Sequence, residues 1–328
     1  MSMFNLSLTA CSFHIRIQNT RNHIPPINLN DVILIEDKES KVVQNSTIID
    51  CFKGFFEKYS TAINDNIAQK TFSCEFKDTY QGETKDYRYL YTVIYSGLYG
   101  SASEIRDITT RKIKHKKRTN EADERPFYLY IVIPKDSEDV KVQKGMLLFQ
   151  NIGPFGIKTI TTNKMIQYFS EHYSLTLRWS TIAADLFIRK ILTQGKIKKL
   201  TMVKNHLSND NSDHIGVGYG VETRTISDFT FTESKWKQIL DKIQYCTKGR
   251  YNLFEFENIT YDHLKVLVTI GDRTRIVDVH NIENLSIIEG IPDEIKMADG
   301  LPDKELLLKH FENVSNEYLS EMVLSIEK

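Results

Sequence analysis

Residues 126–134 read PFYLYIVIP, and residues 145–152 read GMLLFQNI. Both runs are short and apolar, and β-branched and aromatic side chains dominate the first of them, which is typical of buried strands. Prolines bracket the first run, and proline is tolerated at the ends of a strand far better than in its interior. These two segments therefore predict two buried strands in the middle of the chain.

Alternating segments on both sides of this pair predict further strands, at residues 11–18, 70–77, 87–96, 175–179, 195–204 and 253–256, with a hairpin over 265–280 that turns at Gly271. Helical spacing of apolar residues predicts helices from residue 48, after a cap at Ser46 or Thr47, and after a cap at Thr161 or Thr162. Helices are also expected at 182–192, 233–245 and 304–326. The mixture predicts an α+β protein in which antiparallel hairpins dominate.

A chain of 328 residues is long enough for two subdomains. We predict an N-terminal α+β domain over residues 1–125, which carries a basic hairpin arm. We predict a second α+β domain over residues 126–328, with a basic middle and an acidic C-terminal helix.

Composition narrows the class of protein. The chain is 41% hydrophobic and 26% charged, as in ordinary globular proteins. No apolar run approaches the roughly 18–20 residues that cross a bilayer, and the N-terminus has no basic region typical of a signal peptide. The four cysteines form no CxxC pair, so we expect reduced, buried thiols and a cytoplasmic protein.

The charge is strongly segregated along the chain, although the formal net charge is zero. Residues 111–118 (RKIKHKKR) have a net charge of +6, residues 140–209 have +9, and residues 251–328 have −9. Residues 186–209 contain no acidic side chain. Such asymmetry is an argument about partners, and two acid-free stretches on one surface are suited to a phosphate backbone.

The two basic stretches have a plainer explanation as solvated loops. We favour a different explanation, in which residues 111–118 lie at the far end of a hairpin arm. They would belong to a return strand that follows the strand at 87–96, and residues 119–125 would form the connector. The predicted nucleic-acid-binding residues are those of the arm and of the segment around the strand at 195–204: Arg111, Lys112, Lys114, Lys116, Lys117, Arg118, Arg189, Lys190, Lys196, Lys198, Lys199 and Lys204.

Enzyme signatures are weak throughout the chain. There is no GxxxxGK[ST], HExxH or GxSxG, and the glycines at 216, 218 and 220 lack the spacing of a dinucleotide fingerprint. Glu83-Thr84-Lys85, after Asp78, resembles the ExK pattern of metal-dependent nucleases, and His263 begins an incomplete HxK pattern. We expect no enzyme activity, no metal and no cofactor, with a degenerate nuclease and a protein-interaction scaffold as the alternatives.

The order of segments from Phe127 to about Tyr173, with the turn Gly153-Pro154-Phe155-Gly156 between a buried strand and a helix, resembles the RexA family of lambda-type Rex exclusion proteins. It is similar, more loosely, to the KwaB subunit of the Kiwa defence system. The resemblance implies a cytoplasmic phage-exclusion protein that binds double-stranded DNA without strong sequence preference, as a dimer, beside a separate membrane effector. The hypothesis from sequence is therefore a non-enzymatic DNA-binding protein of phage defence.

Overall fold

The computed structural model describes residues 5–20, 24–36, 43–180, 196–204, 221–227, 254–256, 259–261, 263–270, 273–278 and 287–323. The chain divides into two compact units. The arm unit comprises residues 12–179, and the terminal unit comprises residues 1–11 and 180–328. The boundary expected between residues 125 and 126 falls inside a continuous strand, β10 (Asp123–Pro134).

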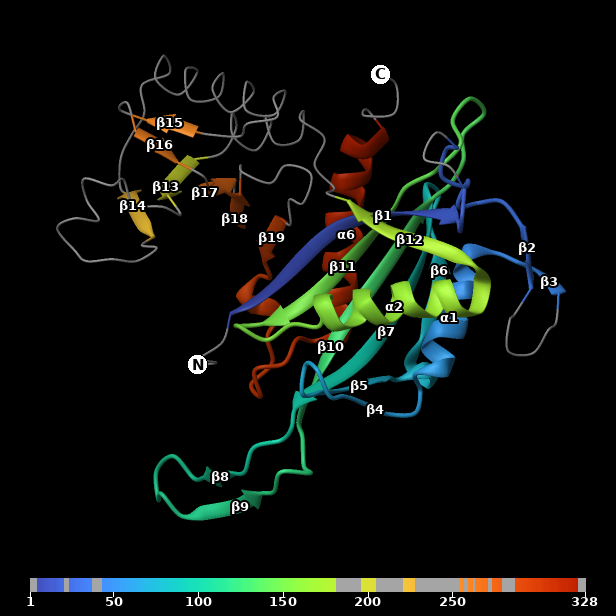
Figure 1. Ribbon diagram of the computed structural model, residues 1–328. Coiled ribbons are helices and arrows are strands. Elements are labelled where there is room, and N and C mark those ends of the chain that lie inside the picture. The colour runs from blue at the N-terminus through green and yellow to red at the C-terminus, as the bar shows by residue number, and fades with distance from the viewer. Residues whose placement is uncertain are drawn as a thin grey trace. The chain divides into compact units, whose positions relative to one another are not determined.

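The arm unit is built on one sheet of long and short strands (Figure 1). Its strand order is β1-β11-β10-β7-β5-β4, with β12 beside β1 and β6 beside β7. The bounds are β1 (Leu6–Ile17, shared with the terminal unit), β11 (Gly145–Ile152), β7 (Tyr87–Leu98), β5 (Lys70–Cys74), β4 (Ile63–Asp65), β12 (Leu175–Ser180) and β6 (Tyr80–Glu83). The pairs β4–β5, β5–β7, β6–β7, β7–β10 and β10–β11 are all antiparallel, which confirms the predicted α+β class.

The apolar run at 126–134 lies at the centre of this sheet. It belongs to β10, which pairs with β11 on one side and with β7 on the other. Leu129, Val132 and the residues between them are at most 1% exposed, because neighbours cover both faces of the strand. Tyr130 stacks on Tyr89 with ring centroids 5.0 Å apart. The apolar run therefore forms the core, as predicted.

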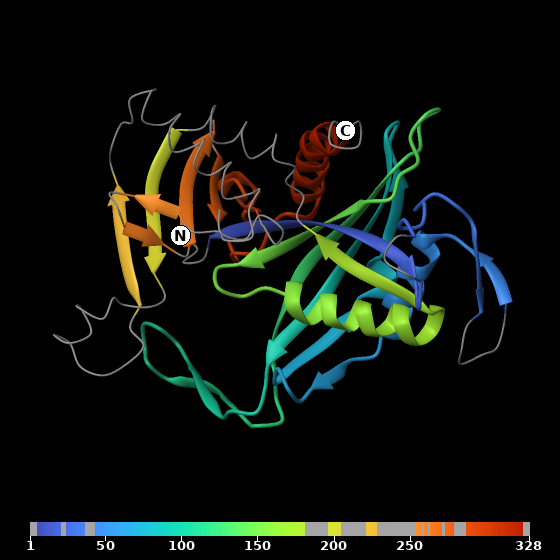
Figure 2. The same ribbon diagram turned by 45° about the horizontal axis from the view of Figure 1, so that its top comes forward.

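Two helices cover one face of the arm-unit sheet (Figures 1 and 2). α1 (Ile48–Lys58) begins at Thr47, whose side chain and the Asp50 carboxylate accept each other's backbone N–H groups in a capping box. α2 (Lys158–Tyr173) lies beside it. The ring centroid of Phe52 in α1 lies 5.4 Å from that of Phe13 in β1 and 5.0 Å from that of Phe169 in α2. The helices and the sheet therefore share one aromatic core.

The predicted start of α2 is wrong by one turn. The helix begins at Lys158, and Thr161 and Thr162 are buried inside it instead of capping it. The Gly153–Gly156 turn, closed by hydrogen bonds between Ile152 and Phe155, delivers the chain directly into the helix. A small hairpin of β2 (Ile33–Glu36) and β3 (Val43–Ser46) and a 3-10 turn at Phe76–Asp78 are further regular elements of this unit.

The predicted partner of the strand at 87–96 is also wrong. β7 pairs with β10 over twelve residues, from Leu98 opposite Asp123 to Tyr87 opposite Pro134. The expected return strand instead folds on itself, because β8 (Ser103–Arg106) pairs with β9 (Ile113–Lys117). Residues 123–125, which were expected in a connector, are the first residues of β10.

The strands of the terminal unit pair antiparallel in the order β14-β13-β17-β18-β19-β1. The bounds are β13 (Lys196–Lys204), β14 (Glu222–Ser227), β17 (His263–Ile270), β18 (Arg273–Asp278) and β19 (Ile287–Gly290), with β15 (Phe254–Phe256) and β16 (Ile259–Tyr261) as a separate pair. The hairpin predicted over 265–280 is therefore confirmed. After a 3-10 turn at Asp293–Ile295, the last helix, α6 (Lys304–Val323), buries the side chains of Leu307, Phe311, Val314 and Tyr318. The helices expected at 182–192 and 233–245 lie outside the described residues.

Candidate nucleic-acid interface

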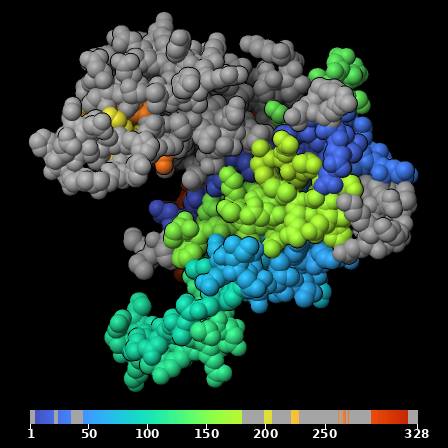
Figure 3. Space-filling view, in the orientation of Figure 1, coloured from blue at the N-terminus to red at the C-terminus, as the bar shows by residue number. Residues whose placement is uncertain are grey.

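The basic run at 111–118 lies on a two-stranded arm formed by β8, β9 and the turn between them. Figures 1 and 3 show the arm projecting away from the rest of the arm unit. All four residues of β8 are exposed, and so are the first four of β9. In β9, Lys114 has no cross-strand partner, since the register shifts between Ile105 and Arg106. This register shift is a β-bulge in the arm.

The tip of the arm is a well-defined turn. The Asp107 carboxylate accepts hydrogen bonds from the backbone N–H groups of Thr109 (3.1 Å) and Thr110 (2.7 Å). The N–H of Thr110 is the largest cause of the lowered pKa of Asp107. The Arg106 guanidinium donates to the carbonyl oxygen of Arg111, a residue with a φ of 56°. The turn leaves the Ile108 side chain 90% exposed.

The proximal cations of the arm are held by local partners. Lys116 Nζ lies 3.9 Å from Glu104, and Lys117 Nζ donates to the carbonyl oxygen of Leu98 at 2.7 Å. The Glu121 carboxylate accepts from the backbone N–H of Arg118 at 2.8 Å and lies 3.0 Å from His115 Nε2. The N–H of Arg118 is the first cause of the lowered pKa of Glu121, and the Arg118 charge adds to it. These contacts tie the Lys117 side chain and the Arg118 backbone to the root of the arm and place two carboxylates beside the proximal cations.

The distal cations are different. Among the described residues, no carboxylate forms an ion pair with Arg111, Lys112 or Lys114, and all three side chains are exposed. They lie around the exposed turn at the end of the arm. The predicted patch therefore divides into a proximal part beside two carboxylates, Glu104 and Glu121, and a distal part without an ion pair to any described carboxylate, which is the part suited to a polyanion.

The second predicted patch lies on β13 of the terminal unit, which Figure 2 shows between β14 and β17. A bulge at Lys198 separates Ile197 from Lys199 in the register with β17, and both lysines are exposed. Leu200 and Met202 are fully buried. The bulge gives β13 two adjacent outward lysines, which strict alternation does not.

Carboxylates are unevenly distributed around β13. Lys199 lies opposite Ser227 on β14 and Leu267 on β17, whereas Lys204 lies opposite Glu222. Lys196 begins the strand, and Arg189 and Lys190 lie outside the described residues. Among the described side chains of this patch, Lys198 and Lys199 are therefore exposed lysines with no carboxylate opposite them. The patches belong to different units, so their convergence stays a prediction.

A third group of cations was missed by sequence reasoning. His14 on β1 is half-buried, and its pKa is lowered first by burial and then by the charges of Arg16, Lys144 and Arg178. These residues come from β1, from the residue just before β11 and from β12. No local sequence signal joins segments so far apart, although the alternation of β1 places His14 and Arg16 on one face.

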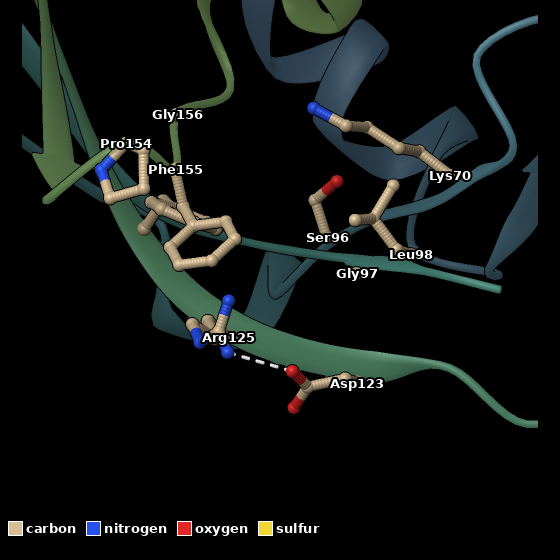
Figure 4. Close-up of a pocket in the computed structure, with 10 residues that line it drawn as sticks. Lys70, Ser96, Gly97, Leu98, Asp123, Arg125, Pro154, Phe155 and Gly156 are labelled. Atoms are coloured by element: carbon tan, nitrogen blue, oxygen red, sulfur yellow. Dashed lines mark hydrogen bonds and ion pairs between the residues drawn. The ribbon is translucent and has the colours of Figure 1, made fainter. Parts of the chain in front are cut away.

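A pocket of about 280 Å³ lies at the root of the arm. Figure 4 shows Arg125 between Phe155 and Asp123. The guanidinium carbon lies 4.0 Å from the centre of the Phe155 ring, and a guanidinium nitrogen lies 2.7 Å from the Asp123 carboxylate. Arg125 thus fastens the Gly153–Gly156 turn to β10. The charge of Arg125 is paired with the Asp123 carboxylate, so Arg125 is not a lone cation in this pocket.

The nuclease-like residues do not assemble in the described part of the chain. Glu83 is largely exposed and pairs with Lys135 at 3.4 Å. No group of three His, Cys, Asp or Glu side chains suited to a metal ion is found among the described residues. The glycines at 216–220 lie outside them. Cys11, Cys51 and Cys74 are buried, and burial raises the pKa of Cys51 to about 12.

Comparison with known protein families, with curated proteins and with solved structures finds no match to this chain. In the described ranges, no helix combines the length and the apolar character that crossing a bilayer requires.

Proposed function

We propose that this protein binds double-stranded DNA through its phosphate backbone, without strong sequence preference and without catalysis. The observation that carries the proposal is the exposed arm with its three unneutralised cations, Arg111, Lys112 and Lys114. Cations on a projecting arm can approach the phosphates of a duplex more easily than cations on a flat surface. Phosphate contacts of this kind set affinity but read no bases.

Aromatic side chains near the arm support backbone binding over base stacking. Phe127 is buried, and Tyr128 stacks on Tyr91 with ring centroids 5.5 Å apart. Both belong to the sheet and are unavailable as a platform for unpaired bases. The resemblance to Rex exclusion proteins extends the proposal to a cytoplasmic phage-defence protein, which acts as a homodimer with a membrane effector.

The test is the salt dependence of binding, measured by fluorescence anisotropy with a labelled duplex. We expect the logarithm of affinity to fall with the logarithm of salt concentration, with a slope of about −0.9 per phosphate contact and roughly 4–7 contacts. Reversal of Arg111, Lys112 and Lys114 to Glu removes up to three contacts and flattens the slope by about 2–3.

Two matched variants make the test specific. Reversal of Lys116, Lys117 and Arg118 carries the same charge change, but we expect a smaller loss of slope, because Lys116 lies near Glu104, Lys117 donates to the Leu98 carbonyl and the charge of Arg118 acts on Glu121. Reversal of Lys58, Lys77 and Lys85, which are exposed in the arm unit outside the arm, controls for net charge. An equal slope in all three variants would show that net charge, and not the arm tip, governs binding. Failure of the wild type to bind at low salt removes the proposal.

A further inference from the structure

The arm presents apolar as well as cationic side chains. Ile105, Ile108 and Ile113 are 54%, 90% and 41% exposed, although a single hairpin carries all three. A lone exposed isoleucine is ordinary on a protein surface. Three exposed isoleucines in one projecting hairpin, one of them at its tip, indicate a surface that binds a partner.

The tip holds its isoleucine in a defined position. Ile108 follows Asp107, whose carboxylate accepts hydrogen bonds from the backbone N–H groups of Thr109 and Thr110, and the Arg106 guanidinium closes the turn on the carbonyl oxygen of Arg111. The side chain therefore stands at the end of an ordered turn. The cations Arg111 and Lys112 come shortly after it in the sequence, and Lys114 follows at the bulge.

We propose that Ile108 enters the minor groove of a DNA duplex and inserts between two stacked base pairs, so that the bound DNA is kinked. This inference rests on the proposed function. An apolar wedge carried into the groove by flanking cations partly unstacks one step and bends the duplex by about 20–90°. Two-stranded ribbons are known to bind in DNA grooves, so the shape of the arm fits the site.

The positive charges beside Ile108 favour duplex DNA, which is a polyanion, over a purely apolar partner. Arg111 and Lys112 flank the tip on its C-terminal side and reach phosphates beside the groove while Ile108 lies within it. The backbone N–H groups of Thr109 and Thr110 are already bonded to Asp107, and the exposed donors of the tip include the side chains of Arg111 and Lys112. Arg and Lys read only the degenerate pattern of the minor groove, which agrees with insertion that depends on deformability more than on base identity.

The experiment measures bending and unstacking separately from binding. A duplex of about 25 base pairs, labelled at both ends for energy transfer, reports the end-to-end distance, and internal 2-aminopurine reports unstacking. With wild-type protein we expect higher transfer efficiency and brighter 2-aminopurine. With Ile108→Ser we expect both changes to fall by at least about half, while Kd changes by less than about tenfold, because the phosphate contacts remain.

Two variants control the measurement. Ile67→Ser removes an isoleucine that is 99% exposed in the turn between β4 and β5, and it should leave both signals unchanged. Ile108→Leu keeps an apolar wedge and should retain most of the bend. Thermal unfolding of each variant checks that the fold is intact.

The outcomes separate this inference from the proposed function. Wild-type binding with neither bending nor unstacking overturns the wedge and leaves backbone binding in place. Equal loss of signal in the Ile67 and Ile108 variants overturns it as well. No binding of duplex by the wild type removes both. Binding to vesicles of anionic lipid that depends on Ile108, together with a straight duplex, assigns the arm to a membrane surface and overturns the inference.

Discussion

The ammonium group of Lys117 donates a 2.7 Å hydrogen bond to the carbonyl oxygen of Leu98, the last residue of β7. The bond joins the returning strand of the arm to the strand from which the arm departs. It also shows that a lysine in a cationic run can serve the fold instead of a ligand. The position of a charge in the run therefore decides its role.

The first prediction concerns this hydrogen bond. Lys117→Met removes the donor but keeps most of the aliphatic stem, so we expect the root of the arm to loosen and amide hydrogen exchange in residues 103–117 to accelerate. Lys112→Met, which changes a cation at the tip, is the control and should leave exchange at the root unaltered. Equal acceleration in both variants would contradict a specific role for the bond between Lys117 and Leu98.

The second prediction concerns the two basic patches. If they form one surface, Lys198→Glu with Lys199→Glu and the reversal of the arm tip should each flatten the salt slope on the same short duplex, by about 0.9 for each phosphate that is no longer bound. The measurement is the anisotropy titration on a duplex of about 12 base pairs at one-to-one stoichiometry. A slope that responds only to the arm tip would place β13 outside the interface.

The third prediction concerns the glycine at the root of the arm. A Cβ at Gly97 would lie 2.2 Å from the backbone oxygen of Asp123, because β7 and β10 approach closely there. Gly97→Ala should therefore open the pairing and lower the free energy of unfolding by about 1–3 kcal/mol. Gly290→Ala is the control, since no atom lies within 4 Å of its added Cβ. Urea unfolding that shows equal stability for the two variants would contradict the close approach.

The fourth prediction is a pH dependence. Asp65 has a lowered pKa, chiefly because the N–H of Ala68 donates to its carboxylate, and Lys164 lies 3.0 Å away. A lowered folded-state pKa stabilises the fold above the unfolded value of about 3.9, and this stabilisation is lost as the pH falls through the folded value. Asp65→Asn should therefore be less stable than wild type at neutral pH, with the difference shrinking below about pH 4. Urea midpoints at several pH values measure it, with Asp86→Asn as the control.

The fifth prediction tests the cation cluster around His14. Burial, Arg16, Lys144 and Arg178 lower the pKa of His14 in that order. Lys144→Ala removes one repulsive charge and should raise the pKa of His14, as followed by NMR of the imidazole ring. Lys141→Ala provides a comparison nearby in sequence, because Lys141 pairs with Asp136 at 3.2 Å. A His14 pKa that is the same in wild type and in Lys144→Ala would exclude the charge effect.

Much of the fold was predictable from local pattern. The runs at β10 and β11 are apolar on both faces, and the cap at Thr47 is written in the sequence, with Asp50 three residues later. The partner of β7 was predicted wrongly because two strand-like segments follow it. The side chains explain which of the two segments pairs with β7. β9 is polar apart from Ile113, whereas Leu129 and Ile131 of β10 are buried and can pack in the same core as β7.

The candidate site was predictable as a charge pattern but not as a structure. Sequence showed the run of cations at 111–118, yet it could not show that Glu104 and the Leu98 carbonyl bind the proximal lysines. Those contacts depend on the register of a hairpin with a bulge, which alternation alone does not fix. The group around His14 depends on the topology of three distant strands and had no local signature.

The outer edges of β8 and β9 have no partner strand in the described part of the chain. Open edges of this kind are templates on which further copies of a chain can add strands, and lysines are a common natural safeguard against it. The cations of the arm therefore also oppose self-association, since two like-charged ribbons repel each other. Because that repulsion acts between solvated charges, it weakens at high ionic strength, so concentrated salt should favour aggregation through the arm.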